Sequence, residues 1–298
     1  MIVMKATYRL FRSFAAVLLA AAISPVFAAG GGYPLDRFPT GKLNDVPALQ
    51  RGAKLYANYC MGCHSLGSMR FNRMRDLDLT EDQIKENLIF TQAKVGELMT
   101  IPMRASDAKE WFGAMPPDLS VTARARSSGD GSGSDWIYTF LRSFYRDANR
   151  PTGWNNAVFP SVGMPHVLWP LEGQRNATVT EIHADPQAAD HGGHGAGPMI
   201  RKVTRYDAQG LTTTTTDKLS ADSHSHAGTT FSFGQASGGT MTNIGYDEAV
   251  GDLTAYLTYV SDPSAKTRNR LGIWVLMFLS VFFVAAWMLN AAFWKDIK

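Results

Sequence analysis

The chain has 298 residues, of which 45% are hydrophobic and 18% charged, with 29 basic and 26 acidic side chains. Three of the basic residues and none of the acidic ones lie in the first 28 positions, so the remaining chain is electrically balanced. That balance indicates no nucleic-acid surface and no strongly acidic docking face. Because the chain has only two cysteines, a disulfide framework and a four-cysteine zinc site are excluded.

Residues 1–28 have the pattern of a secretory signal peptide. Three basic residues precede the apolar stretch 14–23, and the small residues that follow predict cleavage after Ala28. An uncleaved N-terminal anchor is the alternative, which Ser24 and Pro25 disfavour. Because such a signal directs export, we expect residues 29–265 to form a periplasmic domain.

An amphipathic helix is predicted immediately before the two cysteines. Asn44, Asp45 and Pro47 provide start signals for it. Small and apolar residues then recur at i, i+3, i+4 and i+7, the spacing of one helix face. The helix is expected to run directly into Cys60, and the residues of its buried face are Leu49, Gly52, Ala53 and Tyr56.

Cys60, Cys63 and His64 form the sequence C-x-x-C-H. This is the attachment signature of c-type haem, in which both thiols add to haem vinyl groups and the histidine ligates the iron. A redox-active dithiol of the thioredoxin kind is the alternative, but that chemistry does not require His64, and no βαβ pattern surrounds the motif. The sequence therefore predicts one covalently bound haem c.

The second axial ligand is less well defined by the residues. Low-spin electron-transfer haems usually close the sixth position with methionine or a second histidine. Met115 and Met164 are the main candidates, because each lies in a proline-containing turn that can present its sulfur, and His166 is a third. The pattern of residues alone leaves the choice between the two methionines open.

Three further helices are predicted, whereas strand signals are weak. Residues 80–83 have the pattern of a capping box that opens a helix toward Thr91. Asp135 is suited to cap an aromatic-rich helix over residues 136–146. Residues 246–260 carry a continuous apolar stripe, formed by Tyr246, Ala249, Val250, Leu253, Tyr256, Leu257 and Val260.

Residues 173–243 differ in composition from the rest of the chain. They contain a glycine–histidine cluster and five consecutive threonines at 212–216. A segment with so little apolar surface is expected to form an irregular, low-complexity loop insertion, within which residues 179–182 and 200–206 can pair as a short hairpin. Metal binding is the alternative reading of its histidines, which are His183, His191, His194, His224 and His226.

Residues 271–293 contain no charged side chain. At about 1.5 Å per residue they reach roughly 34 Å, enough to cross a hydrocarbon core of about 30 Å. A buried core helix is the alternative. Without an ionisable residue the span offers no proton path and is predicted to be an anchor, followed by a cytoplasmic tail at 294–298. Its interfacial tryptophans are Trp274, Trp287 and Trp294.

Several motifs resemble those of the cytochrome c1 family in its bacterial form. Residues 50–56, Q-R-G-A-K-L-Y, resemble the family's R-G-x-x-[VL]-Y lead-in to the haem site. Residues 115–120, M-P-P-D-L-S, followed by R-A-R at 124–126, resemble its x-P-P-D-L-S…R-A-R segment. Residues 159–164, F-P-S-V-G-M, resemble the segment that carries the family's axial methionine.

The resemblance implies a mainly α fold: a cytochrome c-type haem domain, whose terminal helices cross, with a long irregular insertion and a single C-terminal transmembrane helix. It implies that haem c is bound through Cys60 and Cys63, with His64 and Met164 as axial ligands and Met115 only packing nearby. It adds further cofactor-binding residues, namely Arg126 on a haem propionate, Pro116 and Pro117 against the macrocycle, and Tyr56 and Trp136, the latter replacing a tyrosine of mitochondrial members.

The resemblance also implies the function. The family's members are electron-transfer subunits of quinol–cytochrome c reductase, the dimeric cytochrome bc1 complex, and are not enzymes by themselves. The implied partners are cytochrome b, the Rieske iron–sulfur protein as donor, a soluble or membrane-bound cytochrome c as acceptor, and lipid of the bacterial inner membrane. The alternatives are a free-standing membrane-anchored cytochrome c that serves a terminal oxidase, and a haem enzyme or gas sensor with an open sixth position.

Overall fold

The computed structural model describes residues 33–185, 199–219 and 226–295. The predicted signal peptide lies outside these residues. The helical elements are η1 (Thr40–Asn44), α2 (Val46–Leu55), η2 (Tyr56–Cys60), η3 (Phe71–Leu77), α3 (Glu81–Leu88), α4 (Ala105–Phe112), α5 (Thr122–Ala125), α6 (Gly133–Leu141), α7 (Trp169–Glu172), α8 (Asn243–Ser261) and α9 (Ala265–Phe293). The strands are β1 (Leu66–Arg70), β2 (Leu98–Met99), β3 (Phe144–Arg146), β4 (Trp154–Asn156), β5 (Gly173–Gln174), β6 (Ala177–Ala184), β7 (Met199–Tyr206), β8 (Thr212–Lys218), β9 (Gly228–Phe233) and β10 (Ser237–Gly238).

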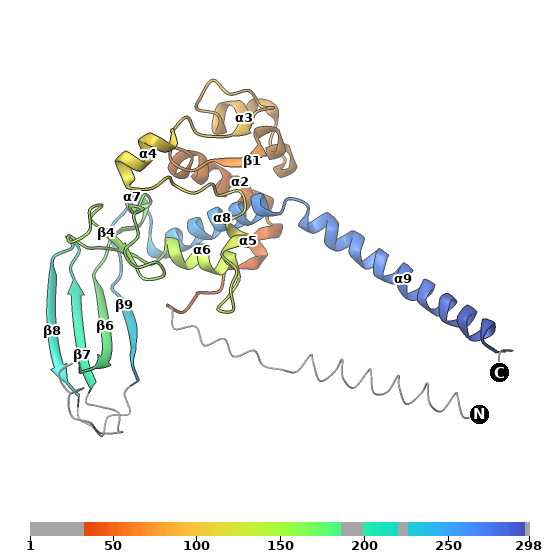
Figure 1. Ribbon diagram of the computed structural model, residues 1–298. Helices are drawn as coiled ribbons and strands as arrows, with labels where there is room; N and C mark the ends of the chain where they lie inside the picture. The colour runs from red at the N-terminus through yellow and green to blue at the C-terminus, as the bar shows by residue number, and fades with distance from the viewer. Residues whose placement is uncertain (1–32, 186–198, 220–225, 296–298) are drawn as a thin grey trace.

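Helices α2 and α8 pack directly against each other at the centre of the domain (Figure 1). A Cβ atom at Gly52 would lie 2.1 Å from the carbonyl oxygen of Asp252 and 2.7 Å from the Cβ of Tyr256, so only glycine allows this approach. Leu49 and Leu253 are buried beside the contact. The crossing of the two helices that the family resemblance implies is therefore present.

Of two predicted helix starts, the one at Thr80 matches the structure and the one at Asp135 does not. The capping box at Thr80 is present, and α3 ends at Leu88, three residues before the expected Thr91. The prediction that Asp135 caps a helix over 136–146 is wrong. Ser132 is the N-cap of α6, and Asp135 is the third helical residue, because each side chain bonds to the other's backbone N–H. Helix α6 ends at Leu141, and Phe144–Arg146 is strand β3, paired with β4.

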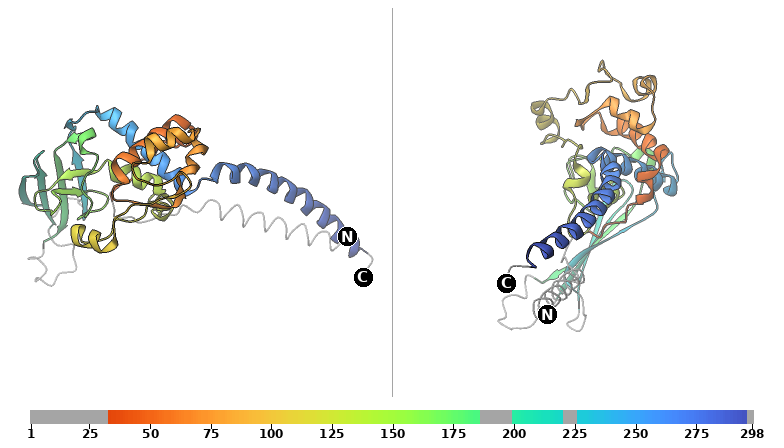
Figure 2. Two further views of the ribbon diagram at one scale, coloured as in Figure 1. Left: turned by 90° about the horizontal axis from the view of Figure 1, so that it is seen from above. Right: turned by 90° about the vertical axis from the view of Figure 1, so that its right-hand side faces the viewer.

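The C-terminal helices match the predictions more closely. Helix α8 contains the whole apolar stripe expected at 246–260, and the side chain of Thr242 caps its N-terminus. Helix α9 is apolar, and none of its residues is buried within the protein. It projects away from the rest of the protein in every view (Figures 1 and 2). By length and composition it is able to cross a membrane, which supports the predicted single-pass anchor.

The insertion is not irregular where the structure describes it, so that part of the prediction is wrong. Its strands form a four-stranded antiparallel sheet in the order β8-β7-β6-β9 (Figure 1). The expected hairpin is confirmed and is longer than predicted, since β6 pairs with β7 from Ala177 to Ala184. Threonine, which is common in this segment, favours strands because its side chain is β-branched. Alternate residues on one face of the sheet pack against Tyr145. The packed residues are Ala177, Val179, Tyr206, Phe231 and Phe233.

The metal-binding alternative for the insertion concerns five histidines, two of which lie within the described residues. His183 and His226 are exposed, and the described residues contain no group of three or more histidine, cysteine or acidic side chains placed to hold a metal ion. His191, His194 and His224 lie outside the described residues. At the base of the insertion, β5 pairs with β10, with Gly173 opposite Gly238.

The helix crossing leads to a stability prediction. We expect Gly52→Ala to lower the free energy of unfolding by about 1–3 kcal/mol, because the added methyl group would overlap the backbone of α8. In an exposed helix the same change would instead stabilise by about 1 kcal/mol. Thermal unfolding of the detergent-solubilised protein, followed by circular dichroism, measures the change. Gly41→Ala is the matched control, since no atom lies within 4 Å of the added methyl group, and an equal loss of stability in both variants would contradict the prediction.

Candidate functional site

A cavity of about 430 Å³ lies between the end of η2, helices α6 and α8, and the loops near residues 115 and 164. Its volume falls within the range of roughly 300–1,000 Å³ of small-molecule and cofactor sites. Apolar side chains such as Phe140 and Leu253 form most of its wall. Every residue predicted to bind the cofactor lines this cavity except Tyr56, and these are Cys60, Cys63, His64, Pro116, Pro117, Arg126, Trp136 and Met164.

His64 is held in one tautomer by the backbone. Its Nδ1 lies 2.7 Å from the carbonyl oxygen of Pro117, and because a carbonyl only accepts, Nδ1 carries the proton. The lone pair is then on Nε2, the atom left free to ligate a metal. Burial lowers the pKa of His64, although the Pro117 carbonyl opposes this. The ring is therefore neutral near pH 7, as ligation requires.

Tyr56 lies behind the cavity wall and supports the His64 segment. Its side chain is fully buried, and its hydroxyl donates a hydrogen bond of 2.6 Å to the carbonyl oxygen of His64. Its ring packs against that of Tyr256 on α8, with ring centroids 5.7 Å apart. Tyr56 thus joins the histidine to the central helix crossing and does not itself reach the cavity.

The two cysteines have the environment of attachment residues more than that of a redox dithiol. Cys60 is buried, and burial, followed by the nearby Cys63, raises the pKa of its thiol to about 12. A thioredoxin-like dithiol needs a lowered thiol pKa to supply a reactive thiolate. Both cysteines instead line the mostly apolar cavity, which fits covalent attachment to an apolar macrocycle.

Arg126 supplies a positive charge at the cavity. Its guanidinium carbon lies 4.4 Å from the centroid of Trp136 and 5.7 Å from that of Phe159, and Trp136 is stacked on Phe140 at 4.8 Å. No carboxylate within the described ranges forms an ion pair with Arg126. An arginine fixed by aromatic rings and without an acidic partner is well suited to bind an anionic group of a ligand, such as a propionate.

The two candidate methionines reach the cavity from different segments. Met115, which is 41% exposed, directly precedes the proline pair whose second carbonyl binds His64. It therefore lies in the segment that supports the histidine. Met164 belongs to a separate loop, between β4 and α7. Both methionines thus line the cavity, and only Met115 is continuous with the segment that bonds His64.

Two asparagines that sequence reasoning missed fix the chain before Met164. Asn156 is fully buried, and its side-chain nitrogen donates to the carbonyl oxygen of Phe140 at 2.7 Å. Its side-chain oxygen accepts from the backbone N–H groups of Val158 and Phe159. The side-chain oxygen of Asn155 accepts from the N–H of Ser161 at 2.8 Å. Ser161 has φ of 62°, in the left-handed region, so these bonds hold an uncommon turn. The only sequence signal was the Asn-Asn pair itself.

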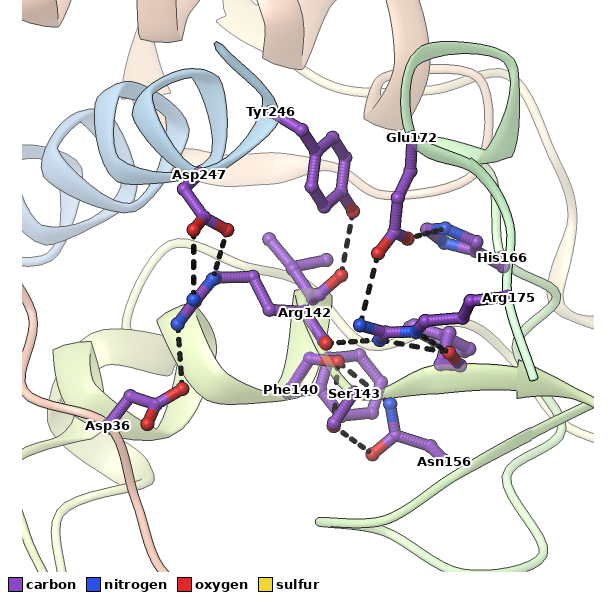
Figure 3. A network of polar contacts seen from close by, with 12 residues as sticks. Asp36, Phe140, Arg142, Ser143, Asn156, His166, Glu172, Arg175, Tyr246 and Asp247 are labelled. Carbon is purple, nitrogen blue, oxygen red and sulfur yellow. Dashed lines mark hydrogen bonds and ion pairs between the residues drawn. The ribbon is translucent and has the colours of Figure 1, made fainter. Parts of the chain in front are cut away.

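His166, the third candidate ligand, is corrected by the structure. It is 2% exposed and does not line the cavity. Its Nε2 lies 2.6 Å from Oε2 of Glu172 (Figure 3). Its ring is stacked on Phe144, with ring centroids 4.9 Å apart. The imidazole is thereby committed to a buried carboxylate and does not reach the cavity.

Removing the Tyr56 hydroxyl tests its supporting role. We expect Tyr56→Phe to destabilise the folded protein by about 1–3 kcal/mol, because the buried carbonyl of His64 loses its donor, while haem attachment is retained. Thermal unfolding of the haem-loaded protein measures this change. Tyr138→Phe serves as control, since the Tyr138 hydroxyl has no hydrogen-bond partner within the described ranges, and equal effects of both variants would contradict the assignment.

Comparison with known proteins agrees with this geometry. Residues 38–176 match the model of the Cytochrome C1 family. The chain is 38% identical to the cytochrome c1 of Allochromatium vinosum, over 95% of this chain and 97% of that protein. It is 37% identical to a protein of Nitrosomonas europaea named ammonia monooxygenase gamma subunit, over 94% and 97% of the two chains. It is 25% identical to the cytochrome c1 of Rhodospirillum rubrum, over 85% and 83%.

Proposed function

The chain belongs to the cytochrome c1 family, and from this we propose that it is the haem subunit of a bacterial quinol–cytochrome c reductase. In this role it receives electrons from a Rieske iron–sulfur protein and delivers them to a soluble or membrane-bound cytochrome c. The observation that carries the proposal is the convergence of two thiols, a neutral imidazole, a thioether and an arginine without an acidic partner on one apolar cavity.

The residues around the cavity fit a covalently bound haem c. Cys60 and Cys63 would hold the group, and His64 and Met164 would supply its two axial ligands. When bound, haem c supplies one-electron chemistry through the ferrous and ferric states of its iron. With His64 and Met164 bound, both axial positions would be filled by side chains of the chain itself, and the apolar wall would limit the access of water to the group. A closed coordination sphere favours electron transfer over oxygen activation, which needs an open position.

Arg126 and α9 supply the remaining parts of the proposed role. Arg126 would neutralise a propionate at the cavity. Helix α9 would hold the haem domain at the periplasmic face of the inner membrane, with its apolar surface covered by lipid or by cytochrome b. The exposed side chains along its whole length support such a cover. Dimeric assembly of the complex is proposed from family membership alone.

Two other functions are kept as candidates. The relative named ammonia monooxygenase gamma subunit is nearly as similar as the cytochrome c1 of Allochromatium vinosum, so association with a monooxygenase is the second candidate. A free-standing membrane cytochrome c that shuttles electrons to a terminal oxidase is the third. All three roles use the same haem domain, and the partners that bind it distinguish them.

Co-purification from native membranes tests the proposed partners. We expect the tagged chain, solubilised in a mild detergent, to carry cytochrome b and a Rieske protein and to show antimycin-sensitive quinol oxidation. A monooxygenase subunit in their place would support the second candidate. A lone c-type haem protein recovered under several mild detergents would overturn the reductase assignment and support the free-standing cytochrome.

Paired methionine variants test the ligand assignment. We expect Met164→Leu to abolish the methionine–iron charge-transfer band, lower the midpoint potential and let the ferrous protein bind carbon monoxide, because leucine cannot ligate iron. Met115→Leu is the matched control and should leave the absorption spectrum nearly unchanged. Loss of the band in Met115→Leu with its retention in Met164→Leu would reverse the assignment.

A further inference from the structure

The residues that follow Met164 are anchored by a buried polar network (Figure 3). His166, two positions beyond the methionine, lies with its ring stacked on Phe144 at an interplanar angle of 9°. The indole of Trp154 lies edge-on to the imidazole of His166, with ring centroids 5.1 Å apart. With Nε2 bonded to Glu172, the imidazole is restrained by one stacked ring, one edge-on ring and one hydrogen bond.

Glu172 passes this restraint to the core of the domain. It is buried at the end of α7, and its other oxygen, Oε1, lies 3.3 Å from Nη1 of Arg175. The guanidinium group of Arg175 also donates to the carbonyl oxygens of Arg142 and Phe144. Those carbonyls belong to the segment that joins α6 to β3, so the loop is connected to a helix of the cavity wall.

The segment that carries Met164 is therefore fixed at both ends. Before it, Asn155 holds Ser161, and after it, Glu172 holds His166. Two residues of extended chain reach at most about 7 Å, so the position of His166 limits where the backbone of Met164 can lie. Methionine itself has three rotatable bonds and positions its sulfur poorly without such a restraint.

We propose that His166, Glu172 and Arg175 form a positioning network that holds the Met164 sulfur in place as an axial ligand. The inference rests on the proposed role of Met164. None of the three side chains lines the cavity, so the network acts on the sulfur indirectly, through the backbone of the loop. A buried ionic network is costly where apolar residues would fill the same space. Here the network holds His166, two residues from the methionine, and so pre-organises the loop. A pre-organised loop loses less conformational entropy when the thioether ligates.

Glu172→Gln in the full-length, haem-loaded protein tests the network. Glutamine keeps the size of the side chain but removes its negative charge. That charge attracts Arg175 and also strengthens the hydrogen bond to His166. We expect a weaker methionine–iron charge-transfer band, a lower midpoint potential and an about tenfold higher affinity of the ferrous protein for carbon monoxide. A tenfold change corresponds to about 1.4 kcal/mol of lost ligation free energy.

Asp252→Asn is the matched control for general loss of stability. Asp252 is also a buried carboxylate with two basic partners, Lys42 at 2.7 Å and Arg51 at 2.6 Å, but it lies at the α2–α8 crossing, away from the methionine loop. We expect this variant to lower the melting temperature while leaving the band and the carbon monoxide affinity unchanged. Equal spectral changes in both variants, or none in Glu172→Gln, would overturn the proposal.

Arg175→Lys keeps the test valid if Glu172→Gln does not accumulate with haem. Lysine retains the positive charge but cannot donate to Glu172 and to the two backbone carbonyls from one planar group, so the same shifts are expected with smaller size. An unchanged band and potential in this variant would count against the network. If Met164→Leu abolishes the band while the network variants leave it intact, the network proposal fails and the ligand assignment stands. Partner co-purification tests the reductase role separately.

Discussion

The close crossing of α2 and α8 is the contact on which the rest of the domain depends. At Gly52 the two helices approach until backbone meets backbone, and the Nε of Arg51 donates to Asp252, 201 positions later in the chain. Helix α2 continues into the segment that carries Cys60, while α8 contributes Leu253 to the cavity wall. The crossing therefore brings the haem-attachment segment next to one wall of the cavity.

The histidine side of the site could be predicted from the sequence because its determinants are local. Cys60, Cys63 and His64 lie within five consecutive residues at the C-terminal end of a helical segment whose periodicity is plain. On the methionine side the residue pattern left Met115 and Met164 open, and only the family resemblance favoured Met164. The structural observation that distinguishes the two, the bond between the Pro117 carbonyl and the histidine ring, is long-range and is not visible in the sequence. The same limit applies to His166 and Tyr56. Their residue types were visible in the sequence, but the partners that remove them from the cavity wall were not.

The helices were predicted well and the inserted sheet was not, for a related reason. Helical periodicity shows in one segment, whereas a sheet depends on pairing between segments. Strand β8 is fully exposed and consists mostly of threonine, so it carries no alternation that marks a strand. Its place in the sheet comes from its ladder with β7. The error at Asp135 was smaller, since Ser132 three residues earlier is an equally good cap and forms the reciprocal pair with it.

The pairing of β5 with β10 gives the insertion an unusual independence. Because Gly173 stands opposite Gly238, the chain leaves the haem domain and returns to it at nearly the same point. A Cβ atom at Gly173 would lie 2.2 Å from the carbonyl oxygen of Ser237, so the two strands are held tightly at this neck. The neck therefore holds the adjoining ends of α7 and α8 together whatever the composition of the outer strands. The sheet itself still contacts the haem domain, through Tyr145 and through Phe233, whose ring centroid lies 4.4 Å from the guanidinium carbon of Arg175. Evolution is thus free to vary exposed positions such as the threonines of β8, but not the sheet face that touches the domain, without altering the spacing on which the electron-transfer site relies.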